Sequence, residues 1–255
     1  MSQKPILQMN GICKNFGAVK ALQNVDFEIL PGEVVGLVGD NGAGKYTLIK
    51  IISGVEHFDE GTIIFEDQEV NISNPEIAKE LGIETLYQDL ALIHNLDVAA
   101  NLHLGREKYN SYLFGLIKVL KNQEMEKDTV ALLDRLQINL GSIREKVDVL
   151  SGGQRQAIAL SRAVGWGKKL VLLDEPTAAL GVRESKQAVE LIRRLKDQNI
   201  ATVVISHNLE HVFSVVDRIV VLRQGIIRGE RGIEDADVNE IVSMITGADE
   251  LKKGM

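Results

Sequence analysis

The chain has 255 residues, of which 45% are hydrophobic and 25% charged, the composition of an ordinary globular protein. Lysine and arginine number 29 and aspartate and glutamate 36, and the net charge of −7 argues against a protein that coats nucleic acid. The single Cys13 excludes an internal disulfide and a cysteine-based zinc cluster. The N-terminus does not resemble a signal peptide, and no apolar run approaches the ~20 residues that cross a bilayer. We expect a soluble, cytoplasmic chain whose membrane role would come through a partner.

The first half of the chain predicts a strand, a loop, a helix and an antiparallel hairpin, in that order. Residues 34–38 form a continuous apolar run, typical of a parallel strand covered on both faces. Residues 47–53 carry apolar side chains on one helical face and are followed by a glycine, which favours a helix end. Residues 61–66, followed by Asp67 and Gln68, are typical of a hairpin at a sheet edge.

The second half begins with a long segment, from about 89 to 160, whose pattern is mainly helical and contains no confident strand. We predict an inserted helical lobe there. The chain then returns to the alternation of strands and helices that indicates an α/β core. The elements expected in this part are strands at 170–173 and 201–205, a helix at 184–198, a hairpin over 218–228 that breaks at Gly225, and a helix after Glu234 that ends at about Thr246.

A glycine-rich loop joins the first predicted strand to the first predicted helix. Its sequence is Gly39-Asp40-Asn41-Gly42-Ala43-Gly44-Lys45. Glycines let backbone N–H groups turn toward an anion, the helix N-terminus adds a partial positive charge, and Lys45 has the reach to contact terminal phosphates. A glycine turn with a surface lysine is the alternative, but the strand–loop–helix context favours a phosphate-binding loop.

The residue after the lysine departs from the phosphate-loop pattern. A serine or threonine is expected there as a Mg²⁺ ligand, whereas this chain has Tyr46, and Thr47 comes one position too late. A phenol on a rigid ring cannot place its oxygen where a serine hydroxyl would lie. We expect nucleotide binding to survive and the metal site to be weakened, with Thr47 or a water as substitute ligand, the ring turned outward, or little metal bound.

Two acids end the apolar strand predicted at 170–173. Asp174 and Glu175 precede Pro176, and the carboxyl end of such a strand opens on the ligand crevice of an α/β sheet. Asp174 suits a ligand of Mg²⁺ or of its water, and Glu175 suits the base that orients an attacking water. Solvated acids before a proline turn are the alternative, and the nearby phosphate-binding loop favours catalysis.

A second helix start with phosphate-binding character lies in Leu150-Ser151-Gly152-Gly153-Gln154-Arg155-Gln156. Ser151 is a favourable N-cap residue, and the two glycines permit close approach of the backbone to an anion. Two such helix starts in one chain suggest a nucleotide held between two copies, each of which supplies a different half of the site.

These motifs, in this order and approximate spacing, resemble the ATP-binding cassette ATPases over about residues 5 to 235. The resemblance implies a P-loop NTPase (RecA-like) α/β core with an antiparallel β edge and an inserted α-helical subdomain, and it implies ATP and Mg²⁺ as cofactors. The implied division is a single ATPase domain at 5–246, with the core at 5–88 and 161–235, a helical subdomain at 89–160, and a C-terminal helix and tail at 236–255.

Three further residues gain a role only from this resemblance. Phe16 lies where the family stacks an aromatic ring on adenine, and His207 ends a predicted strand as the family's γ-phosphate histidine does. Gln88 matches the glutamine that senses the metal or the attacking water and joins the core to the helical lobe. Standing alone, Phe16 and His207 would more often be structural residues.

The stretch from Tyr87 to Asn101, continued by Leu104-Gly105-Arg106-Glu107, is similar to the ATPases of monosaccharide importers of the ribose, xylose and fructose type. Many of those carry two cassettes in one chain, whereas this chain has one. Gly181 stands where the family usually has an aspartate that makes polar contacts across the dimer, so the coupling between the two sites is in doubt here.

The resemblance therefore implies the ATP-hydrolysing subunit of a sugar importer. We expect a homodimer in the ATP-bound state, transmembrane permease subunits, an extracellular or periplasmic sugar-binding protein as an indirect partner, and a location at the cytoplasmic face of the membrane. Ser151, Gly152, Gly153 and Gln154 are implied nucleotide contacts. The implied catalytic residues are Lys45, Gln88, Glu175 and His207, and the implied metal ligands are Thr47, Gln88 and Asp174.

Two alternatives stay open. A soluble cassette ATPase that acts on ribosomes or DNA would usually carry two cassettes or long coiled arms, and this acidic chain has neither. A nucleotide-binding module impaired in hydrolysis is the other, because of Tyr46. Copurification with a polytopic membrane protein separates the importer from both, and ATP turnover separates the impaired module.

Overall fold

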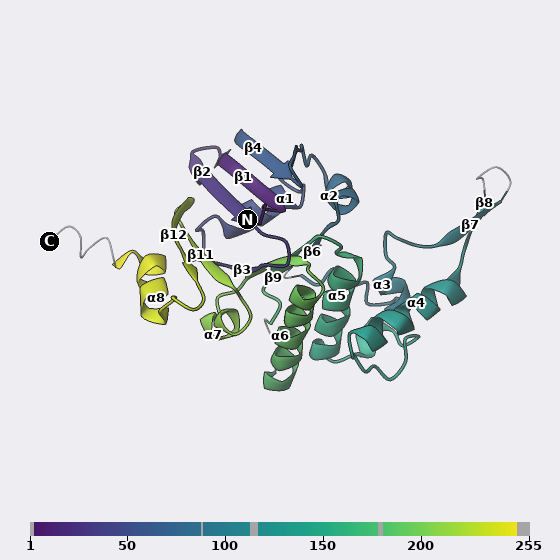
Figure 1. Ribbon diagram of the computed structural model, residues 1–255. Helices are drawn as coiled ribbons and strands as arrows, with labels where there is room; N and C mark the ends of the chain where they lie inside the picture. Colours follow the sequence, from purple (N-terminus) through teal and green to yellow (C-terminus); the bar gives the residue numbers. More distant parts are fainter. Residues whose placement is uncertain (1–2, 88, 113–116, 178–180, 249–255) are drawn as a thin grey trace.

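The computed structural model describes residues 3–87, 89–112, 117–177 and 181–248 (Figure 1). These residues form a six-stranded sheet, a four-stranded antiparallel sheet, a two-stranded sheet and the helices that pack around them. Over the described ranges, no helix combines the length and the apolar character needed to cross a membrane. The α/β architecture expected from the sequence is confirmed.

The six-stranded sheet contains, in spatial order, β12 (Ile226–Gly232), β11 (Arg218–Arg223), β3 (Val34–Val38), β10 (Ala201–Ile205), β9 (Leu170–Asp174) and β6 (Ile83–Leu86). All neighbours are parallel except β11 and β12, which form the predicted hairpin. The three strands predicted from continuous apolar runs, β3, β9 and β10, are confirmed. They are buried over their whole length, as a parallel sheet covered on both faces requires.

The four-stranded antiparallel sheet lies over one face of this sheet (Figure 1). It contains β2 (Val19–Ile29), β1 (Leu7–Phe16), β4 (Glu60–Phe65) and β5 (Gln68–Glu69), in that order. The predicted hairpin at 61–68 is confirmed as β4 and β5. Its turn residues Glu66 and Asp67 both have positive φ, 49° and 63°, which suits the tight turn of a two-residue hairpin.

Helices cover the sheets and build the middle of the chain. The predicted helices at 47–53 and 184–198 are confirmed, each beginning two residues earlier than expected, and the C-terminal helix is confirmed as well. The helices are α1 (Lys45–Ile52), α2 (Pro75–Leu81), α3 (Val98–Leu102), α4 (Asn122–Arg135), α5 (Gly152–Trp166), α6 (Val182–Asp197), α7 (Leu209–Phe213) and α8 (Val238–Thr246), with a 3-10 turn at Val147–Val149.

The segment between about 89 and 160 is mainly helical, as expected, but it also contains two strands that the sequence pattern did not predict. An antiparallel hairpin, β7 (Tyr109–Tyr112) and β8 (Ile117–Leu120), stands between α3 and α4. All eight strand residues are exposed. Because both faces of the hairpin meet solvent, its apolar residues need not alternate with polar ones, and the period-2 signal of a half-buried strand is absent.

The core lies on both faces of the six-stranded sheet, and strand alternation divides it. In β3, Val35 and Leu37 pack toward β1, β2, β4 and α1. Val34 and Val38 pack on the opposite face, toward α5, α6, α7 and α8. The successive residues of one strand thus anchor two layers. A smaller cluster joins α3, α4 and α5, and it includes Leu102, Leu133 and Ile158.

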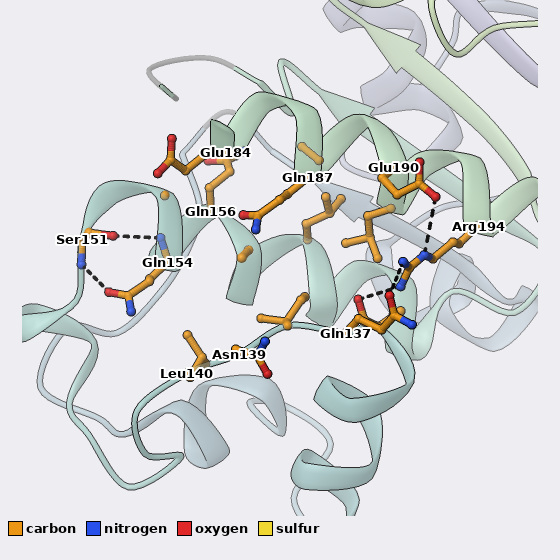
Figure 2. Close-up of a pocket in the computed structure, with 17 residues that line it drawn as sticks. Gln137, Asn139, Leu140, Ser151, Gln154, Gln156, Glu184, Gln187, Glu190 and Arg194 are labelled. Atoms are coloured by element: carbon orange, nitrogen blue, oxygen red, sulfur yellow. Dashed lines mark hydrogen bonds and ion pairs between the residues drawn. The ribbon is translucent and has the colours of Figure 1, made fainter. Parts of the chain in front are cut away.

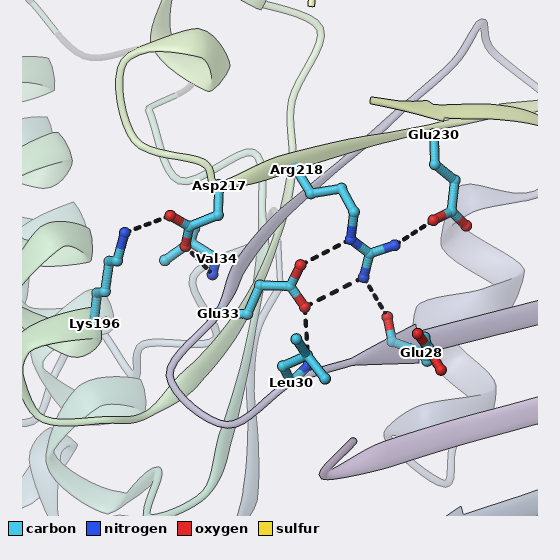
Figure 3. Close-up of polar contacts among 8 residues, drawn as sticks. All are labelled: Glu28, Leu30, Glu33, Val34, Lys196, Asp217, Arg218 and Glu230. Carbon is cyan, nitrogen blue, oxygen red and sulfur yellow. Dashed lines mark hydrogen bonds and ion pairs between the residues drawn. The ribbon is translucent and has the colours of Figure 1, made fainter. Parts of the chain in front are cut away.

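A network of ion pairs fixes the beginning of β3 (Figure 3). Arg218 donates to both oxygens of Glu33, at 2.8 and 3.2 Å, and also to the Glu28 carbonyl and the Glu230 carboxylate. Next to it, Asp217 accepts from the backbone N–H of Val34 at 2.9 Å. The network ties β3 to β11 and β2 at the end of the sheet opposite the glycine-rich loop.

Candidate functional site

The glycine-rich loop lies between the carboxyl end of β3 and the start of α1, in the context that the sequence predicts. Two of its glycines are required by geometry. Gly39 has φ +155° and Gly44 has φ +107°, and a side-chain carbon would lie 2.1 Å from the Leu222 carbonyl oxygen or 2.6 Å from that of Ala21. The loop is therefore pressed against β11 and β2, which fixes its path.

The N-terminus of α1 has the features of an anion-binding site. Its N-cap residue is Gly44, and no side chain caps the helix. The first N–H groups of an α-helix have no acceptor within the helix, and the helix dipole is positive at this end. These groups, from Lys45 onward, are available to phosphate oxygens.

Lys45 is buried at this helix start. Its ammonium donates to the carbonyl oxygens of Gly39, at 2.7 Å, and Asp40, at 2.9 Å. Burial lowers the pKa of Lys45 from its ordinary value, although the negative charges of Glu175, Asp40 and Asp174 act in the opposite direction. Among the described residues, the hydrogen bonds of this buried cation go to neutral carbonyls, so an approaching phosphate would stabilise its charged form.

Tyr46 stays beside this lysine. Its ring centroid lies 5.7 Å from Lys45 Nζ, and the residue is 37% exposed. Burial and the negative charges of Asp174 and Glu175 raise the pKa of the phenol, which is therefore neutral. The partly exposed ring therefore lies next to the lysine at the start of α1. Thr47, a candidate substitute ligand predicted from the sequence, is half-buried.

Asp174 and Glu175 are both buried at the carboxyl end of β9. The register of the sheet places Asp174 opposite Ile205, the last residue of β10. Glu175 then turns out of the strand with φ +50°, and its N–H donates to the Ile205 carbonyl at 2.9 Å. A non-glycine residue in this region carries backbone strain, and such strain is found at functional sites.

The Glu175 carboxylate is held by the two residues that follow β10. One oxygen accepts from the His207 backbone N–H at 3.0 Å and from His207 Nδ1 at 2.8 Å, and the other accepts from Ser206 Oγ at 3.2 Å. Because an ionised carboxylate only accepts, Nδ1 carries a proton. The His207 side chain is 80% exposed, so its far nitrogen faces the open side of the site.

The second predicted phosphate-binding helix start is α5. Ser151 caps it with a reciprocal pair of bonds: Ser151 Oγ accepts from the Gln154 N–H at 3.2 Å, and the Gln154 side chain accepts from the Ser151 N–H at 2.9 Å (Figure 2). The cap holds the turn at Gly152 and Gly153 rigid. Behind it, a cavity of about 570 Å³ opens between α5 and α6, and the residues of the glycine-rich loop do not line it.

Two contacts that the sequence did not predict connect these parts. The Gln156 side chain donates to the Pro176 carbonyl at 2.9 Å, which ties α5 to the loop after Glu175. Ser206 orients Glu175, as described above. Gln156 could have been considered from the sequence, because it is the last residue of the 150–156 motif. Nothing in the sequence pointed to Ser206 except its position next to His207.

Phe16 ends β1 with 46% of its surface exposed, and Lys14 Nζ lies 5.1 Å from its ring centroid. Lys14 is held by Glu56 at 2.9 Å and Asp59 at 3.5 Å. The exposed ring is available for stacking. Gln88 lies outside the described residues. Gly181 is the N-cap of α6, and it makes no side-chain capping bond there.

The described residues fit a Mg²⁺ ion that takes few ligands from the protein. No group of three or more His, Cys, Asp or Glu side chains that could hold a metal occurs among them. Mg²⁺ usually keeps several waters and binds one or two carboxylates together with substrate phosphates. Asp174 is a candidate for such a carboxylate, because it is buried at the end of β9 and its negative charge acts on both Lys45 and Tyr46.

The chain is similar to known proteins along nearly its whole length. A family model described as "ABC transporter" matches residues 22–178. A xylose/arabinose import ATP-binding protein of Sulfolobus acidocaldarius is 46% identical, over 94% of this chain and 94% of that protein. A fructose import ATP-binding protein of Rhizobium meliloti is 43% identical, over 98% of this chain and 97% of that protein.

Solved structures have the same fold. A nucleotide-free ATP-binding cassette from an ABC transporter superposes with a TM-score of 0.82 at 28% identity, covering 94% of this chain and 96% of that one. A dimeric cassette in a post-hydrolysis state, bound to ADP and Pi, gives a TM-score of 0.74 at 25% identity, covering 89% of this chain and 98% of that one. The expected P-loop NTPase fold is thereby confirmed.

Proposed function

Because the chain belongs to the ABC transporter family, we propose that it is the ATP-hydrolysing subunit of a sugar importer. The observation that carries the proposal is the juxtaposition of a buried Lys45 at an uncapped helix start with a buried, oriented Glu175. The first feature binds a triphosphate and the second activates water. The xylose/arabinose and fructose import relatives support the choice of sugars as cargo.

The chemistry of the site is positioning and charge stabilisation. Lys45 and the first N–H groups of α1 bind the phosphate chain, and the exposed ring of Phe16 stacks on the adenine. Glu175 accepts a proton from the attacking water, and His207 contacts the γ-phosphate through its exposed far nitrogen. Gln88 is assigned to the metal or the water by resemblance alone.

Magnesium is part of the proposal. When bound, Mg²⁺ neutralises charge on the phosphate oxygens during phosphoryl transfer. Asp174 would hold it directly or through water, and Thr47 is the nearest candidate hydroxyl in sequence. Tyr46 replaces the usual serine, and its neutral phenol is a poor substitute. We therefore propose that the phosphates of ATP supply more of the metal ligands than the protein does.

We further propose that two copies close head to tail on ATP. The capped start of α5, with Ser151, Gly152, Gly153 and Gln154, supplies the half of the site that lies across the nucleotide from Lys45. The rigid cap supports this role because a preorganised turn presents N–H groups without reordering. The dimeric cassette that holds ADP and Pi supports this arrangement.

Permease subunits at the cytoplasmic face of the membrane are the proposed partners, and a sugar-binding protein would act with them indirectly. The domain division that we propose is the one expected from the sequence: a core at 5–88 and 161–235, a helical subdomain at 89–160 and a C-terminal segment at 236–255. The helical subdomain is the candidate surface for the permease.

Uptake of labelled sugar in cells that lack this gene tests the proposal. The parent gene should restore uptake of at least one of xylose, fructose and ribose, whereas Glu175→Gln at equal protein abundance should not. Copurification with a polytopic membrane protein should accompany restored uptake. Unchanged uptake of all three sugars in the deleted cells, with the purified chain bound to ribosomes or DNA, would replace the importer with a soluble cassette ATPase.

A further inference from the structure

The hairpin formed by β7 and β8 is an apolar arm that extends from the helical part of the molecule (Figure 1). Its described strands contain five large apolar or aromatic side chains, each about half exposed. They are Tyr109, Tyr112, Ile117, Val119 and Leu120. No other pair of neighbouring strands in the described ranges presents all of its residues to solvent.

The apolar side chains lie on both faces of the hairpin. The register pairs Tyr109 with Leu120 on one face and Tyr112 with Ile117 on the other, where Val119 also lies. A flat protein surface would cover one face and leave the second in water. An environment that surrounds the arm covers both faces.

The charge of the arm is also distinctive. Lys118 is the single charged residue of the two strands, and its ammonium lies 4.5 Å from the Tyr109 ring centroid. Neither strand contains a carboxylate, although acids outnumber bases in the chain as a whole. Tyrosines beside aliphatic side chains and lysine are the composition that favours the interface between membrane and water.

The base of the arm is anchored to α4. Lys108, which precedes β7, pairs with Glu124 at 2.9 Å and Asp128 at 2.6 Å. The backbone N–H of Lys121 donates to the Lys108 carbonyl at 2.9 Å and so extends the ladder past β8. Glu124 and Asp128 are thus paired with a cation at the base of the arm, and the two strands themselves contain no acid.

We propose that the β7–β8 arm inserts into the headgroup region of an anionic lipid bilayer. The two apolar faces supply the buried area, and Lys118 supplies attraction to the lipid phosphates. The outer edges of a two-stranded sheet leave N–H and C=O groups unpaired, so the arm stays at the hydrated interface and does not enter the hydrocarbon core. The arm would add a direct membrane contact to any contact with permease subunits.

Vesicle cosedimentation of the purified full chain, without ATP or permease, tests this proposal independently of its transport role. The vesicles contain phosphatidylglycerol and phosphatidylcholine, or phosphatidylcholine alone. The variant Tyr112→Ser/Ile117→Ser/Val119→Ser removes one apolar face of the arm. The control Val55→Ser/Val238→Ser/Val242→Ser removes three comparably exposed side chains elsewhere. Circular dichroism and ATP turnover check that both variants are folded.

The parent and the control should bind the anionic vesicles, and the arm variant should lose at least tenfold in partitioning. Lys118→Glu should weaken binding to anionic vesicles and leave the weaker binding to neutral vesicles unchanged. Equal partitioning of parent and arm variant, or no binding of the parent, overturns the proposal. If the parent protein does not bind vesicles, and the arm variant fails to copurify with a permease that the parent protein binds, the partner of the arm is a protein and not lipid.

Discussion

The carboxylate of Glu175 accepts two hydrogen bonds from His207, from its backbone N–H at 3.0 Å and from Nδ1 at 2.8 Å. The two residues follow the neighbouring parallel strands β9 and β10, so the register of the sheet brings them together. Glu175 is thereby held in one orientation before any substrate arrives. A base fixed in this way does not have to be ordered in the transition state.

Replacing this base should separate ATP binding from hydrolysis. Glu175→Gln keeps the shape and one hydrogen-bond acceptor but removes the negative charge and the proton acceptor, so we expect turnover to fall roughly 100-fold or more. ATP binding should persist and an ATP-bound dimer should accumulate, as measured by light scattering with ATP. A variant that hydrolyses ATP at the parental rate would show that another group is the base.

Ser206 provides a milder control for the same carboxylate. Ser206→Ala removes one donor, at 3.2 Å, and leaves both bonds from His207 in place. We expect turnover to fall only a few fold with ATP affinity unchanged. A loss as large as that of Glu175→Gln would assign Ser206 a more direct role in the reaction.

Because of Lys45, the affinity for ATP should fall as the pH rises through the alkaline range. Burial lowers its pKa in the free protein, and bound phosphates raise it again because they favour the charged form. Between these two pKa values, binding therefore takes up a proton, and affinity falls by about tenfold per pH unit as the pH rises. Below the lowered pKa of the free protein, affinity should not depend on this group.

Calorimetry in two buffers of different ionisation enthalpy measures the proton uptake. Lys45→Ala should lose most of the ATP affinity and all of this uptake. If the variant takes up the same proton, the titrating group is elsewhere in the site, and if it binds ATP with parental affinity, the loop at 39–45 is not where the phosphates bind.

The sequence is most informative where one local pattern determines the structure. A continuous apolar run such as 34–38 has few alternatives, because a strand buried on both faces needs apolar residues at every position. The loop after it is equally determined, since Gly39 and Gly44 occupy positions where a side chain would overlap the backbone of β11 or β2. In residues 34–44, the structure that the local sequence favours is also the one that the fold requires.

Other features depend on residues far apart in the chain. The bond from Ser206 to Glu175 joins positions 31 residues apart, and only the pairing of β9 with β10 creates it. The β7–β8 arm was missed for the opposite reason, because it packs on nothing and its residues follow no burial pattern. The hydrophobic period of a sequence arises from burial of one face, and an exposed hairpin buries neither face, so it shows no such period.

Arg218 should contribute strongly to stability. Its side chain and that of Glu33 are largely buried, so Arg218→Met would leave the Glu33 carboxylate without its cation, at a cost of about 3 kcal/mol in the free energy of unfolding. Denaturant unfolding measures the change. Lys4→Met, which breaks the exposed pair with Asp67, should cost less than about 0.5 kcal/mol.

The double variant Arg218→Met/Glu33→Gln distinguishes a buried charge from lost packing. Removing the charge of Glu33 relieves the penalty of an unpaired carboxylate, so the double variant should recover part of the stability that Arg218→Met loses. Glu33 also accepts from the Leu30 N–H at 2.9 Å, and Arg218 donates to the Glu28 carbonyl. A double variant less stable than either single variant would show that the network acts mainly through packing and these two bonds.

Tyr46 should limit the rate of the magnesium-dependent reaction. Its ring lies beside Lys45, and the negative charges of Asp174 and Glu175 add to the effect of burial in raising its pKa. In the proposed metal site, it stands where a serine would reach the metal. The near-octahedral oxygens that Mg²⁺ requires at ~2.0–2.1 Å cannot include a neutral phenol at the end of a rigid ring. Tyr46→Ser should raise the ATPase rate at least tenfold, or ~1.4 kcal/mol of barrier.

Tyr46→Phe is the matched control for this last prediction. It keeps the ring and removes only the hydroxyl, so its rate should stay close to that of the parent if the bulk of the ring, and the missing serine oxygen, are what limit the reaction. Nucleotide affinity should be similar in all three proteins, because in the proposed site Lys45 and the first N–H groups of α1 bind the phosphates. If the parent protein hydrolyses ATP as fast as Tyr46→Ser, the ring does not limit the ATPase rate. If Tyr46→Phe is slower than the parent protein, the phenol hydroxyl itself takes part in the reaction.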